Sequence, residues 1–161
     1  MGNWIKIVGV AWLVMLVIGI LSKIRERDAI IAYTKKVEAI DTSKIESITI
    51  HYRTKQTHRT ANNFTVPASE FCAVATLLKS AAEIDTKPRT PEAAFDFTMK
   101  MKGKSEIFYF SVYHEASHGG AIRHYDGGTK RVFDAGSPAL LKWSQRFTGI
   151  GQKKVLTTSP L

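Results

Sequence analysis

FDFTMKMKGKSEIFYFSVY, residues 95–113, is the stretch of sequence that decides the fold of this chain. Apolar and polar residues alternate over residues 95–101, which is the period of two expected of a strand with one buried face. The polar, glycine-containing turn at residues 102–105 then leads into a second strand-forming run at residues 106–113. Two such runs joined by a short turn predict an antiparallel β-hairpin.

The same pattern extends the predicted sheet in both directions along the chain. Residues 46–53 alternate in the same way, and residues 63–66 predict a short second strand. Residues 121–125 and 130–133 flank the turn sequence Asp126-Gly127-Gly128. Because short turns connect neighbouring antiparallel strands, the second half of the chain is expected to form a meander.

Two helices are predicted beside these strands. The first is opened by residues 67–70, PASE, with Ser69 as its N-cap. Its buried face is expected to contain Phe71, Val74, Leu77 or Leu78, and Ala81. Cys72 is the only cysteine and is interpreted as a small buried apolar residue beside that face.

The second helix starts at Ser137-Pro138, as cap and first residue. Its buried face is expected to contain Leu140, Trp143 and Phe147. No alternation of strand, helix and parallel strand occurs along the chain, so the fold class predicted for the domain is α+β. We expect a small antiparallel sheet with helices packed on one face.

An apolar run, WIKIVGVAWLVMLVIGILS, precedes this domain at residues 4–22. As a helix it would be about 28 Å long, enough for the hydrocarbon core of a bilayer. Lys6 lies one turn from its start, where the long side chain can extend to the head groups. No small-x-small cleavage site follows Leu21, and residues 28–40 continue at helical spacing. The sequence therefore predicts a single, uncleaved transmembrane helix that continues toward the domain.

This interpretation divides the chain into three parts. Residues 1–27 form the anchor with its juxtamembrane basic segment, residues 28–148 form a single α+β domain, and residues 149–161 form a flexible tail. We expect a single-pass protein of the inner cell membrane. Lysine and arginine after the span favour a cytoplasmic domain. A charged leader followed by an apolar run and a β-rich domain is instead typical of bacterial signal-anchors that export the domain, so the side is left open.

The chain is basic, with 23 lysine and arginine residues against 14 acidic ones in 161 residues and a net charge of +9. Anionic surroundings are therefore favoured. Two rows of basic residues on predicted strands are the candidates for partner binding, with only Asp96 as a nearby acid. These rows are His51, Arg53 and Lys55, and Lys100, Lys102 and Lys104. Nucleic acid is disfavoured, because no RNA-binding motif or recognition helix accompanies the charge. Anionic lipid stays an alternative ligand.

One segment has the pattern of an enzyme. Residues 114–118, HEASH, match the H-E-x-x-H zinc motif, with Glu115 as the general base. His114, His118 and His124 would be the ligands, in the spacing of the metzincin pattern except that Ala121 replaces its glycine. The motif needs a helix, but strand-forming residues precede it and two glycines follow it. We therefore expect His114 at or beyond a strand end, His118 in a loop, and neither metal nor cofactor.

Without a catalytic constellation, the sequence favours a membrane-anchored, non-enzymatic accessory or interaction domain. Its expected partners are the bilayer, through residues 4–22, and a protein at the membrane, which it would bind as an assembly subunit or an inhibitor. Two alternatives stay open. One is a small zinc-dependent hydrolase that uses the HEASH segment, and the other is a tethered ligand-binding or sensory domain.

Overall fold

The computed structural model describes residues 2–54, 62–84, 91–103, 106–127 and 130–150, with side chains from residue 8 onward. The chain divides into two compact units, Met1–Ala39 and Ile40–Leu161. Each unit is described by itself.

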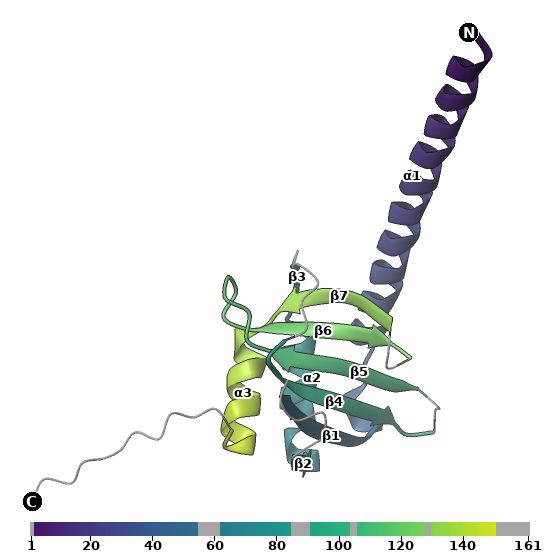
Figure 1. The fold of residues 1–161 in the computed structure, drawn as a ribbon. Coiled ribbons are helices and arrows are strands. Elements are labelled where there is room, and N and C mark those ends of the chain that lie inside the picture. The colour runs from purple at the N-terminus through teal and green to yellow at the C-terminus, as the bar shows by residue number, and fades with distance from the viewer. Residues whose placement is uncertain (1, 55–61, 85–90, 104–105, 128–129, 151–161) are drawn as a thin grey trace, which may run out of the picture. The chain divides into compact units, whose positions relative to one another are not determined.

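The first unit is one helix, α1 (Gly2–Glu38), of 37 residues (Figure 1). It is long and apolar enough to cross a membrane. From Val8 to Ile24 its large apolar side chains are exposed, from 45% for Val17 to 71% for Met15, whereas Tyr33 and Val37 near its C-terminal end are buried. The helix runs without a break to Glu38, so the predicted continuation beyond the apolar segment is confirmed.

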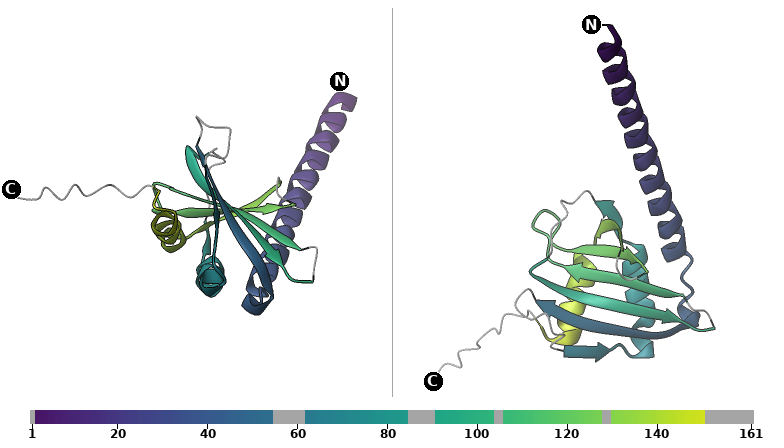
Figure 2. Two further views of the ribbon diagram at one scale, coloured as in Figure 1. Left: turned by 90° about the horizontal axis from the view of Figure 1, so that it is seen from below. Right: turned by 45° about the vertical axis from the view of Figure 1, so that its right-hand side comes forward.

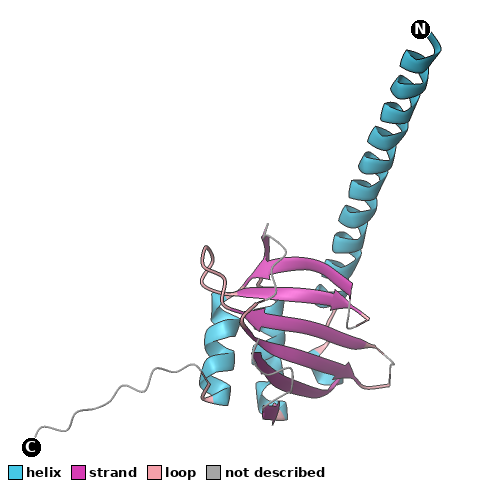
Figure 3. Ribbon diagram, viewed as in Figure 1, coloured by secondary structure: helices cyan, strands magenta, loops and turns pink. Residues whose placement is uncertain are grey.

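The second unit contains a sheet of seven strands in the order β2-β1-β4-β5-β6-β7-β3 (Figures 1 and 3). Every pairing is antiparallel. The strands are β1 (Ile45–Thr54), β2 (Asn62–Thr65), β3 (Ala82–Ile84), β4 (Ala93–Met101), β5 (Ile107–Tyr113), β6 (Ala121–Asp126) and β7 (Lys130–Gly136). The predicted meander is confirmed, because β4 to β7 are consecutive neighbours.

One strand was not predicted. No strand was assigned to residues 82–84 from the sequence, whereas the structure pairs Ile84 with Asp134 as part of β3. Three residues are too few to establish a period of two, and their partner strand lies about 50 residues later in the chain. Only the tertiary pairing with β7 makes this segment a strand.

Helices α2 (Phe71–Lys79) and α3 (Pro138–Thr148) both lie on one face of the sheet (Figure 2). The α+β class and the packing of helices on one side are therefore confirmed. Between sheet and helices lie large apolar side chains, with Phe97 of β4 stacked on Phe110 of β5 at 4.7 Å between ring centroids. The ring of Trp143 on α3 lies 6.4 Å from that of Phe97, which joins the helix layer to the sheet.

The predicted N-terminal cap is confirmed for α3 and wrong for α2. Ser137 accepts a hydrogen bond from the backbone N–H of Leu140, as expected of the cap of α3. Ser69 is not an N-cap: it lies in a short 3-10 helix, η2 (Ala68–Glu70), after which Glu70 precedes α2 without a side-chain cap bond. A second 3-10 helix, η1 (Thr42–Lys44), precedes β1.

The buried face of α2 corrects the interpretation of Cys72. The buried residues of α2 are Phe71, Val74, Ala75 and Leu78, a stripe at the i, i+3, i+4 and i+7 positions of a helix. Cys72 follows Phe71 by one position, about 100° around the axis, and is exposed rather than buried. Ala81 lies beyond the end of α2 and belongs to no buried helix face.

The buried face of α3 agrees with prediction at Leu140 and Trp143. Phe147 is only partly buried, and its ring stacks on Trp143 at 5.0 Å. Gly149 ends the helix with a φ of 70°, a left-handed conformation that glycine adopts without a steric penalty.

Candidate functional site

Successive residues of a strand point to opposite faces of the sheet, so the face opposite α2 and α3 has its own set of side chains. We call this face the polar face. Its central row crosses six strands through directly paired residues. In order from β2 to β7 these are Asn63, His51, Asp96, Ser111, Arg123 and Asp134. Every member of the row is polar, and four of them can carry a charge.

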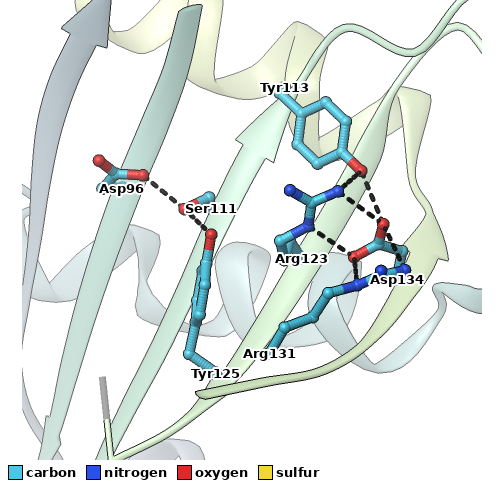
Figure 4. A network of polar contacts seen from close by, with 7 residues as sticks. All are labelled: Asp96, Ser111, Tyr113, Arg123, Tyr125, Arg131 and Asp134. Atoms are coloured by element: carbon cyan, nitrogen blue, oxygen red, sulfur yellow. Dashed lines mark hydrogen bonds and ion pairs between the residues drawn. The ribbon is translucent and has the colours of Figure 1, made fainter. Parts of the chain in front are cut away.

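One half of the polar face is a buried ionic cluster (Figure 4). The carboxylate of Asp134, whose side chain is fully buried, accepts bonds from Arg123 Nε at 2.9 Å and from the Tyr113 hydroxyl at 3.0 Å. Arg131 adds a second guanidinium, with Nη2 3.2 Å from Asp134 Oδ2. The guanidinium of Arg123 also lies over the ring of Tyr113, 5.1 Å from its centroid. Asp134 is therefore the centre that holds two arginines and a tyrosine.

Asp134 raises the pKa of Arg123 above its ordinary value, chiefly through the hydrogen bond between them. The pair thus stays ionised although the side chain of Arg123 is only 9% exposed. Removing charges from water is costly, and close pairing with full hydrogen bonding is what offsets that cost.

The other half of the polar face is closer to the surface. Arg53 Nε lies 2.8 Å from Asp96 Oδ2, with about a third of each side chain exposed. The Ser111 hydroxyl donates to the other carboxylate oxygen of Asp96 and lies 3.4 Å from the Tyr125 hydroxyl oxygen. The hydrogen bond to Asp96 raises the pKa of Arg53. Figure 4 shows Asp96, Ser111 and Tyr125 as a chain beside the Asp134 cluster.

A second row lies next to the central one and is more accessible. Paired residues from β1 to β7 place Thr49, Thr98, Tyr109, Tyr125 and Arg131 in line. All five are partly exposed. The row therefore presents hydroxyl groups and two adjacent phenol rings to the surroundings, with Arg131 at one end.

The predicted basic rows are only partly brought together. The pairing of β1 with β4 puts His51, Arg53 and Lys100 on the polar face. Lys100 pairs with a residue six positions before Arg53 in β1, so the two cations lie about 20 Å apart along the strands. Lys102 lies beyond β4, and its ammonium donates to the Ser43 carbonyl at 3.3 Å. Lys55 and Lys104 lie outside the described residues.

Two of the remaining candidates already have partners. Arg53 is paired with Asp96, and His51 Nδ1 lies 2.7 Å from Asn63 Oδ1. Lys100 is exposed. The polar face is thus a mixed ionic surface with an excess of cations.

The HEASH segment lies in the loop between β5 and β6, so the predicted positions of His114 and His118 are confirmed. Glu115 organises this loop by accepting bonds from the backbone N–H groups of Ser117 and His118 at 2.9 and 3.0 Å. Its carboxylate also lies 2.8 Å from His118 Nδ1. These bonds, that to His118 foremost, lower the pKa of Glu115.

His124 is not part of that loop. It lies within β6, is 1% exposed, and stacks on Phe133 at 4.4 Å between ring centroids. Burial lowers its pKa to about 4. The structure therefore does not bring His124 together with His114 and His118. Within the described ranges, no three or more histidine, cysteine, aspartate or glutamate residues are grouped to hold a metal ion.

Comparison with known protein families, with curated proteins and with solved structures finds no match to this chain.

Sequence reasoning overlooked most of the polar face. The alternation in β4 placed Asp96 opposite the apolar residues, and Ser111 and Tyr113 occupy the same parity in β5. This shared alternation was the signal in the sequence that Asp96, Ser111 and Tyr113 lie on the face opposite the apolar residues. The pairing of Arg123 with Asp134 could not be predicted from the sequence. The register between β6 and β7 shifts between Arg123 and Tyr125, and residue spacing does not reveal such a bulge.

Proposed function

We propose that this protein is a single-pass, membrane-anchored, non-enzymatic accessory or interaction domain. It binds a partner protein at the inner cell membrane, as an assembly subunit or as an inhibitor. The observation that carries the proposal is the polar face, a sheet surface whose charged side chains are fixed by an ionic network instead of by an apolar core.

The energetics of that network support a role beyond folding. Replacing a buried ion pair by apolar residues of similar volume is often neutral or stabilising, so stability alone does not call for Arg123 and Asp134. What the cluster does achieve is rigidity, because Asp134 holds Arg123, Arg131 and Tyr113 at fixed positions. Side chains held in place before binding lose less conformational entropy on association.

The composition of the polar face supports a protein as its partner. Tyrosine and arginine are enriched at the centres of protein interfaces, where a rigid ring or a planar guanidinium gives a large contact at small entropic cost. Tyr109 and Tyr125 are direct cross-strand neighbours on this face, and Arg131 follows Tyr125 on the next strand.

The first unit supports the membrane anchor. The large apolar side chains of α1 from Val8 to Leu21 are 45% or more exposed. In water such a surface is unfavourable, whereas in a bilayer it is the expected one. The basic residues Lys23, Arg25 and Arg27 directly follow this surface and suit the head-group layer.

The zinc-hydrolase alternative has less support. The carboxylate of Glu115, which would have to act as the general base, is engaged by donors of its own loop. His124, the third ligand of the motif, is buried in β6.

A membrane fractionation tests the anchor. We expect the full-length protein to stay in the membrane pellet after a carbonate wash, and a chain that begins at Ile30 to be recovered in the soluble fraction. Release of the full-length protein by carbonate would contradict the anchor.

Isolation of the tagged full-length protein from its native membranes in two mild detergents tests the interaction. We expect one protein to accompany it at a constant ratio in both detergents. Recovery of the chain alone in both, after cross-linking in the intact membrane, would contradict a stable partner.

A further inference from the structure

We infer that the partner binds through an acidic protein segment, and that its docking site is the tyrosine surface of the polar face. This surface consists of Thr49, Thr98, Lys100, Tyr109, Tyr125 and Arg131. The inference rests on the proposed function and names the surface and the chemistry of its partner.

The geometry of the rows defines the surface. Thr98, Tyr109, Tyr125 and Arg131 pair directly across β4, β5, β6 and β7, so their side chains follow each other at about 4.8 Å per strand. Lys100 stands two residues from Thr98 on the same face of β4. Two phenol rings therefore lie between a lysine and an arginine, with the two cations about 15 Å apart across the strands.

Residues of the neighbouring central row hold two side chains of the tyrosine surface in place. The Tyr125 hydroxyl lies 3.4 Å from Ser111 Oγ, and Arg131 is tied to Asp134. Two members of the surface are thus connected to the buried network, which keeps their positions defined before a partner arrives.

The charge of the polar face favours an anionic partner. Among the residues that pairing places there, Arg53, Lys100, Arg123 and Arg131 stand against Asp96 and Asp134, which gives four positive and two negative charges and a net of +2. Lys100 is exposed and, within the described ranges, has no ion-pair partner. About a third of the Arg131 side chain is exposed. Carboxylates about 15 Å apart on one segment could pair with both cations.

A protein segment fits this surface better than a lipid membrane does. A domain that binds a bilayer surface inserts large apolar side chains beside its basic ones. Within the described part of the unit Ile40–Leu161, the one exposed large hydrophobic residue is Ile107, which is 37% exposed and pairs with Lys100 at the edge of this surface. Hydroxyl groups and phenol rings instead match the backbone and carboxylate groups of a protein.

Photo-crosslinking of the full-length protein in its native membranes tests the inference. Tyr109 is replaced by the photoreactive aromatic residue benzoylphenylalanine, and in a parallel variant the exposed Thr76 on α2 is replaced in the same way. We expect a covalent adduct with a protein from position 109 and none from position 76. The mass of the adduct separates a protein from a lipid.

Charge reversal then tests the chemistry of the partner. Lys100→Glu should reduce the yield of the adduct about fivefold or more, because it replaces an attraction by a repulsion. The matched control is Lys142→Glu, which makes the same change of charge at an exposed position on α3 and should leave the yield unchanged. Both variants should melt at the wild-type temperature, because both positions are exposed.

The outcomes separate this inference from the proposed function. A protein adduct from position 76 but not from position 109 would place the interface elsewhere and overturn the inference, while the interaction domain would stand. A lipid adduct alone at position 109 would overturn it in favour of a membrane contact. Equal reductions of the adduct yield in Lys100→Glu and Lys142→Glu would overturn the inference that the partner binds through an acidic segment. If neither position gave a protein adduct and no protein co-purified, the proposed function would be contradicted as well.

Discussion

The two faces of the sheet are built by opposite means, and two consecutive residues of β5 show it. Phe110 is 1% exposed and stacks on Phe97 within the apolar layer beneath α2 and α3. The next residue, Ser111, is 3% exposed and donates a hydrogen bond to Asp96 on the polar face. Both positions are buried, but one is held by dispersion and the hydrophobic effect and the other by directed polar bonds.

The difference concerns specificity as well as stability. An apolar layer accepts many side chains of about the right volume. A buried ionic cluster accepts very few, because each donor and acceptor needs its partner. The polar face is therefore the part of the domain where a specific arrangement of charges and hydroxyl groups is maintained, and it is the part that a partner could recognise.

Phe110→Ala and Ser111→Ala compare the two faces within one strand. Phe110→Ala should lower the free energy of unfolding by about 3 to 5 kcal/mol, because it removes a fully buried ring. Ser111→Ala should lower it by about 1 to 2 kcal/mol, because Asp96 keeps Arg53 and loses only the hydroxyl. Urea unfolding of the full-length protein in detergent measures both. An equal or larger loss for Ser111→Ala would contradict the comparison.

Asp134→Ala tests the centre of the polar face. It should lower the free energy of unfolding by about 3 to 5 kcal/mol, because the buried guanidinium of Arg123 loses its counter-ion. The matched double variant Arg123→Met, Asp134→Leu should recover most of that loss, since Arg131 is partly exposed and can turn toward water. If the single and double variants were equally unstable, shape and not charge pairing would be what the cluster contributes.

How far the sequence predicted the structure depends on the range of the interactions involved. Alternation at residues 95–101 and the cap at Ser137 are local features, and both were recovered. The polar face depends on the register between β6 and β7 and on the adjacency of β1 and β4, which are distant in the chain. No local pattern encodes these pairings, so Asp134 was not recognised as the centre of a cluster. Cys72 was wrong for a different reason: the buried face of α2 was predicted correctly at Phe71 and Val74, but Cys72 lies one position beyond Phe71, outside the buried stripe.

His124 gives the helix-covered face a pH dependence. Its pKa of about 4 in the folded protein lies below the ordinary value of 6.5, so a proton binds the unfolded chain first. The stability present above pH 6.5 should therefore be lost as the pH falls toward 4, by roughly 1 kcal/mol per pH unit. His124→Gln should flatten this slope. The control His114→Gln replaces an exposed imidazole and should keep it. Measurement of the free energy of unfolding between pH 7 and 5 tests this prediction. If the slope of stability against pH were unchanged in His124→Gln, the pH dependence would come from other groups.

The smallest effect on stability is expected from the basic side chains of the two predicted rows. The triple variant Arg53→Gln, Lys100→Gln, Lys102→Gln should change the free energy of unfolding by less than about 1 kcal/mol. Arg53 loses an ion pair with Asp96 in which about a third of each side chain is exposed, and Lys102 loses one bond to a backbone carbonyl. Lys100 is exposed on the surface, and such partly solvated contacts contribute little to folding.

The same triple variant should weaken association with an acidic partner, since it removes three positive charges and leaves Asp96 without its counter-ion. The wild-type interaction should fade as added salt shortens the screening length below about 10 Å, and the variant should depend less on salt. A pair of changes on α3, Lys142→Gln and Arg146→Gln, removes exposed charge away from the polar face and serves as the control. If the triple variant bound the native partner as well as wild type at low salt, Arg53, Lys100 and Lys102 would have no part in binding, and recognition would have to reside in the tyrosines and Arg131.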